Sequence, residues 1–144
     1  MGHSTLPQQA WFLAKTDPET YSIEQFAKDG RTVWDGVRNP QALRAIRAMR
    51  SGDRVFIYHS MGQSAVVGLA EVTSEPRDDP KQPKSAVADF RFLTRLEPQT
   101  TLAEIKASKL FDDWSLVRQS RLSTMAAPES FVAWMRKRHP GVKI

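Results

Sequence analysis

The sequence predicts an α+β domain built on a small, partly closed β-barrel of mixed or mainly antiparallel strands, with inserted and flanking helices. Three observations favour this class. The chain has 144 residues, which suits one domain with one core. Several short apolar segments alternate with helix-like segments, and two of them form a clear hairpin. The regular alternation of strands and helices that is typical of a parallel sheet is missing.

Strands are expected where β-branched and aromatic residues cluster or alternate with polar ones. These segments are 11–14, 31–34, 54–59, 65–72, 87–96 and 122–125. The short loop 60–63 joins two of them, which predicts an antiparallel hairpin and makes the strands look antiparallel in general. Gly68, inside a strand, indicates a bulge or a close approach of another segment. The polar segment 75–85 is expected to be an exposed loop.

Helices are expected after residues that can cap a first turn. Capping boxes are indicated by the pairs Ser22/Gln25 and Thr101/Glu104, and Asn39-Pro40 is typical of an N-cap followed by a first helical residue. The helix that begins at Asn39-Pro40 would end near Met49 and bury Leu43 and Ile46. Further helical segments are expected at 116–120 and 128–138.

The composition indicates a single domain at 10–144, preceded by a disordered leader at 1–9. There is no cysteine, which excludes disulfides, thiolate catalysis and cysteine-based zinc sites. No apolar run approaches the ~20 residues of a membrane span, and the N-terminus lacks the pattern of a signal peptide. A monomer in the cytoplasm is therefore the default expectation.

Basic residues dominate two segments of the chain. The formal net charge is +5, and residues 31–54 contain six arginines against two aspartates, while 118–144 contains six basic residues against one glutamate. Such a charge distribution attracts polyanions at long range, and taken alone it favours a nucleic-acid partner only modestly.

Motifs for catalysis are absent from the sequence. It has neither a phosphate-binding glycine loop nor a nucleophile elbow. Of the three histidines, His59 alone lies inside an expected element, and a lone histidine argues against a metal site. We therefore expect no enzymatic activity, no metal and no cofactor.

The segment 33–39 is the most informative part of the chain. It brings together Trp34, the turn residue Gly36, Arg38 and Asn39 just before a helix. An aromatic face, a cation and an amide are the groups that hold a flat polar ligand such as a nucleobase. The same residues are equally typical of a core tryptophan, a turn and a helix cap, and the segment alone does not decide between these interpretations.

The ordered set of motifs resembles the EVE domain family from about residue 10 to residue 136. The motifs are Trp11-Phe-Leu-Ala-Lys-Thr-Asp-Pro18, Tyr21-Ser22, Val33-Trp-Asp-Gly-Val-Arg-Asn39, Gly52-Asp53, Tyr58-His-Ser60, Val67-Gly-Leu-Ala-Glu-Val72 and Leu116-Val-Arg-Gln-Ser-Arg-Leu-Ser123. The resemblance implies a PUA-like fold related to the YTH readers. It also implies a non-catalytic module that binds DNA or RNA through a modified base, such as methylated or hydroxymethylated cytosine.

A base pocket follows from this resemblance together with residue chemistry. Its expected residues are Lys15, Thr16, Ser22, Trp34, Asn39, Tyr58, His59 and Ser60. Trp34 would stack on the base, and Asn39 would read its edge or simply cap a helix. Strand alternation sends Tyr58 and His59 to opposite faces, so one of them is expected in the core. Ser22 fits a helix cap better than a ligand contact.

Phosphate or sugar contacts are expected from Arg38, Arg118, Gln119, Arg121 and Ser123, since the planar guanidinium donates paired hydrogen bonds to phosphate. The alternative for the arginines is ion pairing with nearby acids such as Asp35 or Asp113. The pocket itself is expected to be open and neutral to basic. Two other functions compete with the base reader, namely binding of a small free ligand such as a nucleoside or metabolite, and hydrolysis of modified nucleic acid.

Overall fold

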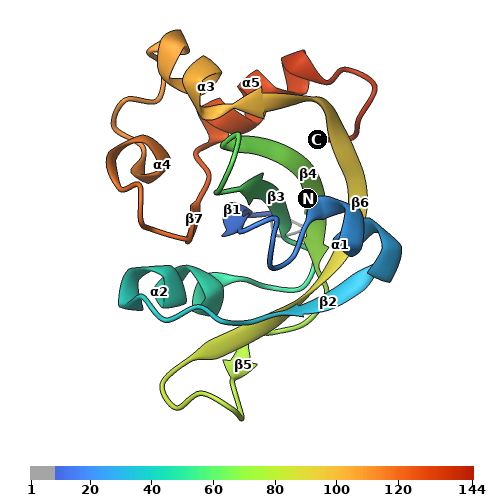
Figure 1. The fold of residues 1–144 in the computed structure, drawn as a ribbon, viewed down its shortest axis with the longest axis vertical. Helices are drawn as coiled ribbons and strands as arrows, with labels where there is room; N and C mark the ends of the chain where they lie inside the picture. Colours follow the sequence, from blue (N-terminus) through green and yellow to red (C-terminus); the bar gives the residue numbers. More distant parts are fainter. Residues whose placement is uncertain (1–8) are drawn as a thin grey trace, which may run out of the picture.

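The computed structural model describes residues 9–144, which fold into a seven-stranded mixed sheet with helices around it (Figure 1). The strand order is β2-β6-β4-β3-β1-β7, and β5 pairs with β6. The elements are β1 (Trp11–Thr16), α1 (Ile23–Asp29), β2 (Arg31–Trp34), α2 (Pro40–Ala48), β3 (Arg54–His59), β4 (Ala65–Val72), β5 (Arg77–Asp78), β6 (Ala86–Thr101), α3 (Leu102–Ser108), α4 (Ser115–Arg118), β7 (Thr124–Ala126) and α5 (Glu129–Arg138). Within this described part, no helix is long and apolar enough to cross a membrane.

The predicted α+β class with a small mixed sheet is confirmed, although the sheet does not close into a barrel. Its path ends at β2 on one side and at β7 on the other. In Figure 1 the long strand β6 bends around the other strands, so the sheet is strongly curved. The predicted leader at 1–9 lies almost wholly outside the described residues.

The expectation of generally antiparallel strands is wrong for the centre of the sheet. β1 pairs with β3 in parallel, with Lys15 opposite Tyr58 and Thr16 opposite His59. The connection between these two strands contains α1, β2 and α2. Because an edge strand is inserted between the two helices, the sequence does not show the simple strand–helix–strand pattern that indicates a crossover.

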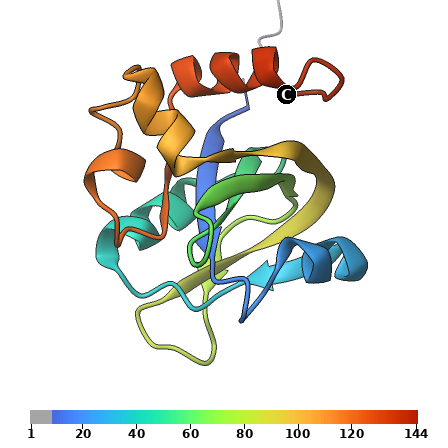
Figure 2. The same ribbon diagram turned by 45° about the horizontal axis from the view of Figure 1, so that its top comes forward.

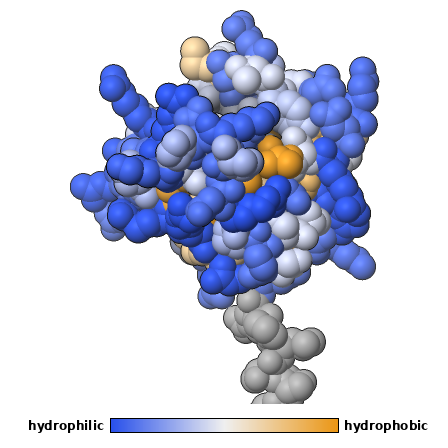
Figure 3. Space-filling model, turned by 90° about the horizontal axis from the view of Figure 1, so that it is seen from below, coloured by the Kyte–Doolittle hydropathy of each residue, from blue (hydrophilic) through white to orange (hydrophobic). Residues whose placement is uncertain are grey.

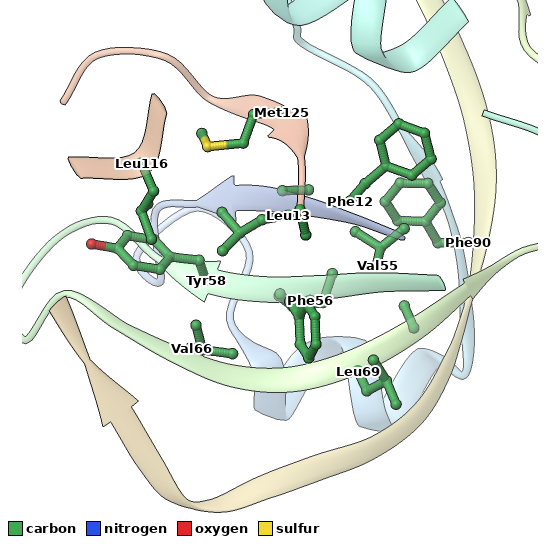
Figure 4. Packing of buried hydrophobic residues seen from close by; sticks show 14 of the residues in the cluster. Phe12, Leu13, Val55, Phe56, Tyr58, Val66, Leu69, Phe90, Leu116 and Met125 are labelled. Carbon is green, nitrogen blue, oxygen red and sulfur yellow. The ribbon is translucent and has the colours of Figure 1, made fainter. Parts of the chain in front are cut away.

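The central strands are buried on both faces, which explains their nearly continuous apolar sequences. Figure 4 shows side chains such as Leu13 from β1, Phe56 from β3 and Leu69 from β4 in the interior. On one face Phe56 contacts Phe131 of α5, with ring centroids 5.3 Å apart. Figure 2 shows β1 running from its start beside α5 toward the region of α1, so the two ends of β1 lie in different surroundings.

Several elements differ in length from the expectation. β6 continues to Thr101 instead of ending at Leu96, the last strand is shifted to 124–126, and the predicted exposed loop at 75–85 contains the two-residue strand β5. β6 pairs with β4 through two register shifts. These shifts let a long, bent strand keep its partners beyond the point where the regular alternation of the sequence ends.

The expected caps begin their helices. Thr101 and Glu104 form the full reciprocal capping box. Ser22 accepts a hydrogen bond from the backbone N–H of Gln25, but the Gln25 side chain donates to Asp29 instead of returning to the cap. The box predicted at Ser22/Gln25 is therefore half formed, because the Asp29 carboxylate, one turn away, accepts the glutamine amide.

The start of α1 is fixed by two contacts with the sheet. The backbone N–H of Ile23 donates to Nε2 of His59 over 3.1 Å. The Ile23 side chain packs directly over Gly68 in β4, where an added Cβ would overlap the Ile23 Cδ1 methyl and lie 3.3 Å from the carbonyl oxygen of Thr94. Gly68 also lies at a register shift. Both alternatives predicted for this glycine, a bulge and a close approach, are confirmed.

Substituting Gly68 with alanine is expected to destabilise the protein by about 1–3 kcal/mol, the usual cost of overfilling a packed core. Adding Ile23→Val, which removes the Cδ1 methyl, should recover part of this loss, so the two substitutions should be non-additive. Denaturant unfolding measures both. Gly141→Ala is the matched control, because an added Cβ meets nothing within 4 Å there. Additive effects of the two substitutions would contradict the packing described.

The unfolding free energy is expected to fall as the pH drops below about 6.5, the usual pKa of histidine. Burial lowers the pKa of His59, Glu24 and Asp17 act in the opposite direction, and Arg95 adds to the lowering. The folded state therefore binds fewer protons than the unfolded chain, so stability is complete above the unfolded pKa and is lost as the pH falls toward the lowered folded pKa.

Unfolding titrations at several pH values between about 5 and 8 check this expectation. His59→Gln should flatten the pH dependence. Burial lowers the pKa of His139 as well, so His139→Gln is measured in parallel to separate the two contributions. An unchanged slope in His59→Gln would show that the bond from Ile23 does not depend on a neutral imidazole.

Candidate nucleic-acid interface

A hollow of about 320 Å³ lies between the end of β1, the segment before α1, and β2. Its volume is at the lower end of the ~300–1,000 Å³ range of small-molecule sites. The lining residues are Thr16, Thr20, Tyr21, Thr32, Val33, Trp34 and Asp35. Of the residues predicted for a base pocket, this hollow contains Thr16 and Trp34.

Trp34 belongs mainly to the core. Its side chain is 6% exposed, and its ring stacks on Phe90 with the centroids 5.0 Å apart. Phe26 lies 6.1 Å away on a second side, and Tyr21 meets the indole edge-on at 6.3 Å. Trp34 lines the hollow but is almost fully buried, so its role as a stacking wall stays a prediction.

Tyr21 is the aromatic residue that sequence reasoning missed. It lines the hollow and is half-buried. Its hydroxyl donates to the Asp29 carboxylate over 2.8 Å, which fixes the ring against α1. Burial raises the pKa of Tyr21, the Thr32 hydroxyl opposes this effect, and Asp29 adds to it. The motif Tyr21-Ser22 was visible in the sequence, but its serine forms a helix cap while its tyrosine faces the hollow.

The charge of the hollow differs from the expectation of a neutral-to-basic pocket. Asp35 is its one charged lining residue, and no lysine or arginine is among the residues that line it. Asp35 follows Trp34 directly and borders the same space, whereas Arg38 comes after the turn at Gly36, where φ is +77°. The hollow is therefore neutral to acidic, and the basic side chains lie outside its lining.

The parallel pairing of β1 and β3 brings several predicted residues together beside the hollow. Thr16 lies opposite His59, and the backbone N–H of Ser60 donates to the Thr16 carbonyl over 3.0 Å. On the other side of β1, the backbone N–H of Lys15 donates to the Ser123 carbonyl over 2.8 Å. Residues from three distant parts of the sequence thus meet at the end of β1.

Lys15 holds the segment 119–123 against the sheet. Its ammonium group donates to the Ser120 carbonyl over 3.0 Å and lies 5.5 Å from the centre of the Tyr58 ring. Burial lowers the pKa of Lys15. Lys15 does not line the hollow, and its ammonium group is already used within the protein, so its predicted contact with a base stays a prediction.

The structure places Tyr58 and His59 away from the hollow, contrary to expectation. Tyr58 is 2% exposed and points toward Leu116 (Figure 4). Burial raises the pKa of Tyr58, and a hydrogen bond with Ser64 opposes this. His59 borders a separate hollow with Glu24 and Arg95, on the other side of the segment before α1. Strand alternation sent the two residues to different sides, as expected, but neither side faces the candidate site.

Two further predicted pocket residues are helix caps. Ser22 accepts from Gln25, and the Asn39 side-chain oxygen accepts from the backbone N–H groups of Gln41 and Ala42 over 2.8 and 3.1 Å. Neither Ser22 nor Asn39 lines the hollow. The capping alternative is confirmed for both, and the amide nitrogen of Asn39 has no hydrogen bond with the residues at 9–144.

Arg38 is presented on a rigid loop. Its neighbour Val37 is buried, and the Val37 carbonyl accepts a hydrogen bond from the buried Ser85 hydroxyl over 2.7 Å. The residue after Arg38 is Asn39, which caps α2. Arg38 itself is exposed and makes no ion pair with any described residue, so the predicted alternative of pairing with Asp35 is not observed.

The remaining predicted phosphate contacts lie on the segment after Trp114. Arg118 pairs with Asp113 at 3.3 Å, and because both side chains are largely exposed this pair is weak and easily exchanged. Gln119 and Arg121 are exposed, and Arg121 has no ion-pair partner in the described part of the chain. Ser123 is half-buried beside Thr124.

The face formed by β2, β5 and α2 is largely hydrophilic, with one small apolar spot near its middle (Figure 3). It offers no broad apolar patch of the kind that marks a permanent protein interface. Among residues 9–144 there is also no group of three or more acidic or histidine side chains that could hold a metal ion.

Comparison with known proteins places these features in a family. The model of the EVE domain family matches residues 10–138. Human thymocyte nuclear protein 1 is 31% identical over 124 residues, which cover 67% of this chain and 55% of that protein. The chain thus spans about half the length of the curated relatives it matches.

Solved structures share the fold. Rpa0253 from Rhodopseudomonas palustris is 32% identical with a TM-score of 0.85, covering 94% of this chain and 96% of that one. Human THYN1, solved in complex with 5-methylcytosine containing DNA, is 25% identical with a TM-score of 0.79. The match covers 90% of this chain and 97% of that one. The YTH domain of Zygosaccharomyces rouxii MRB1, solved with N6-methyladenosine RNA, has a TM-score of 0.54, and the match covers 95% of this chain and 90% of that one. At 16% identity this is a likeness of fold alone. The resemblance seen in the sequence is confirmed, and the chain belongs to the EVE domain family.

Proposed function

We propose that this chain is a non-catalytic module that binds one modified base of a DNA or RNA strand. The base occupies the hollow between Tyr21 and Asp35, and the adjoining phosphates lie over Arg38 and Arg121. One observation supports the proposal: a hollow of small-molecule size has no cation in its lining, while Arg38, three residues after the lining residue Asp35, and Arg121, next to the Ser120 that Lys15 holds, are exposed and have no ion-pair partner among the described residues. A neutral base and an anionic backbone require this separation of environments.

The human relative supports the choice of base. Its structure was solved with DNA that contains 5-methylcytosine, and it is 25% identical to this chain over 90% of the chain's length. We therefore take 5-methylcytosine as the first ligand to test. The closed stack of a duplex cannot enter a hollow of this size, so the base must be unstacked or flipped out of its strand.

Tyr21 and Trp34 form the aromatic wall in this proposal. Stacking of a base on an aromatic side chain contributes about 1–3 kcal/mol. Phe26 and Phe90 pack behind these rings, so the wall is positioned before the ligand arrives. The unengaged amide nitrogen of Asn39 is available as a donor to the base or sugar.

The hollow alone would also suit a free nucleoside, since its lining carries no basic side chain for a phosphate. This is the second candidate function. The two are distinguished by the contribution of the surrounding arginines, which a strand uses and a free nucleoside does not.

Single-stranded oligonucleotides with one 5-methylcytosine are expected to bind roughly fourfold more tightly than their unmethylated counterparts. The factor corresponds to burial of one methyl group, about 0.8 kcal/mol. Fluorescence anisotropy at several salt concentrations measures both the affinities and their salt dependence. Equal, weak and steeply salt-dependent binding of both strands would leave only nonspecific phosphate attraction. Binding of the free nucleoside as tight as that of the strand would support the second candidate instead.

Arg38→Ala and Arg121→Ala are expected to weaken binding of methylated and unmethylated strands by the same factor. Each should also reduce the slope of log affinity against log salt by about 0.7, the value for one lost contact to a single strand. The same titrations measure this.

Lys137→Ala is the matched control for these variants. Lys137 is exposed on α5, and α5 packs beside the start of β1, where Arg136 lies 5.9 Å from the centre of the Trp11 ring. The hollow is at the other end of β1, and a strand rises roughly 3.3 Å per residue. An equal effect of all three substitutions would indicate general charge attraction without a defined backbone path.

A further inference from the structure

Asp35 stands out among the residues that line the hollow. It is the one charged residue in that lining, and its side chain is exposed. Its carboxylate forms no hydrogen bond and no ion pair with any residue that the structure describes. The nearby Asp29, in contrast, accepts hydrogen bonds from Tyr21 and Gln25.

The fold keeps the nearest arginine in sequence from neutralising Asp35. Arg38 lies beyond Gly36, whose φ of +77° turns the chain. Val37 is then buried and held by the Ser85 hydroxyl, and Asn39 is committed to the first turn of α2. These anchors fix the backbone on both sides of Arg38, and no ion pair with Asp35 forms.

Two of the other polar groups of the hollow are already engaged within the protein. The Thr16 hydroxyl donates to the Tyr21 carbonyl over 2.8 Å, and the Tyr21 hydroxyl donates to Asp29. An ionised carboxylate only accepts hydrogen bonds. The hollow therefore presents an unused acceptor with a full negative charge, and a ligand must bring a donor to meet it.

We propose that Asp35 is a specificity-determining residue that accepts a hydrogen bond from the exocyclic amino group of the bound base. The proposal rests on the proposed function and adds the chemical feature of the base that is selected. Among the pyrimidines, cytosine carries this amino group, whereas thymine and uracil present a carbonyl at the same position. A carbonyl oxygen facing the Asp35 carboxylate is rejected, because two acceptors meet and neither is satisfied.

5-Methylcytosine and thymine form the sharpest pair of ligands for this proposal. Both carry the same methyl group on a pyrimidine ring, and they differ in the amino or carbonyl group at position 4 and in the proton on the neighbouring ring nitrogen. Hydrophobic contacts and phosphate contacts are therefore the same for two strands that differ only at this base. The ratio of their affinities isolates the edge that faces Asp35.

The wild-type protein is expected to bind a single strand with one 5-methylcytosine at least about tenfold more tightly than the same strand with thymine, as for a hydrogen bond to a charged group. Asp35→Asn should bring this ratio close to one, since the amide can also donate to a carbonyl. Asp35→Ala should lower the ratio by weakening 5-methylcytosine binding, without a gain for thymine.

Asp112→Asn is the matched charge control. Asp112 is exposed and does not line the hollow. The substitution Asp112→Asn removes the same charge. It should therefore strengthen the binding of both strands slightly and equally and leave the ratio of their affinities unchanged. Thermal unfolding confirms that each variant is folded.

The outcomes separate this proposal from the one on which it rests. A wild-type protein that binds neither strand above nonspecific attraction overturns the proposed function. A wild-type protein that prefers 5-methylcytosine to thymine, with the same preference in Asp35→Asn and Asp35→Ala, overturns the role of Asp35 and leaves the function in place. A lower ratio in both Asp35 variants, with no change in Asp112→Asn, supports it.

Discussion

The parallel pairing of β1 with β3 is the constraint on which the rest of the structure depends. It sets the ends of two strands side by side, so that Thr16 and His59 share one register position. β7 then joins the free side of β1 and brings Ser123 to Lys15. The start of β1 faces α5, and its end faces the hollow. One strand therefore connects the packed end of the molecule to the end where a ligand can enter.

The wall of the hollow is an extension of the core. Trp34 stacks on Phe90 and contacts Phe26, and the same cluster supports Tyr21. Because these rings are packed before any ligand binds, little entropy is lost in ordering them on binding. The same arrangement means that replacing Trp34 would disturb the core as well as the hollow. Tyr21, which is half-buried and fixed through its hydroxyl, is the better position for probing the aromatic wall.

Local signals in the sequence were sufficient for most of the helices and strands but not for their assembly. The caps at Asn39 and Thr101 depend on chemistry within a few residues, and the structure confirms them. A glycine inside a strand also indicated the close approach at Gly68, but the partner, Ile23, lies far away in the sequence and could not be named. The parallel pairing and the bond from Lys15 to Ser120 join residues far apart in the chain, so no local pattern reveals them. The burial of Trp34 was also undecided, because residue type does not say which side of β2 is covered.

The acidic character of the hollow could not be predicted from a net charge of +5, since a sum over the chain hides the sign at a single position. In the proposed function, recognition is divided into two physically separate parts. Arginine–phosphate attraction is long-ranged, independent of the base and weakened by salt. A hydrogen bond to Asp35 acts only at contact and depends on one edge of one base. Salt should therefore change the affinity for every strand while leaving the ratio between two bases nearly constant, because the phosphate contribution is common to both and cancels.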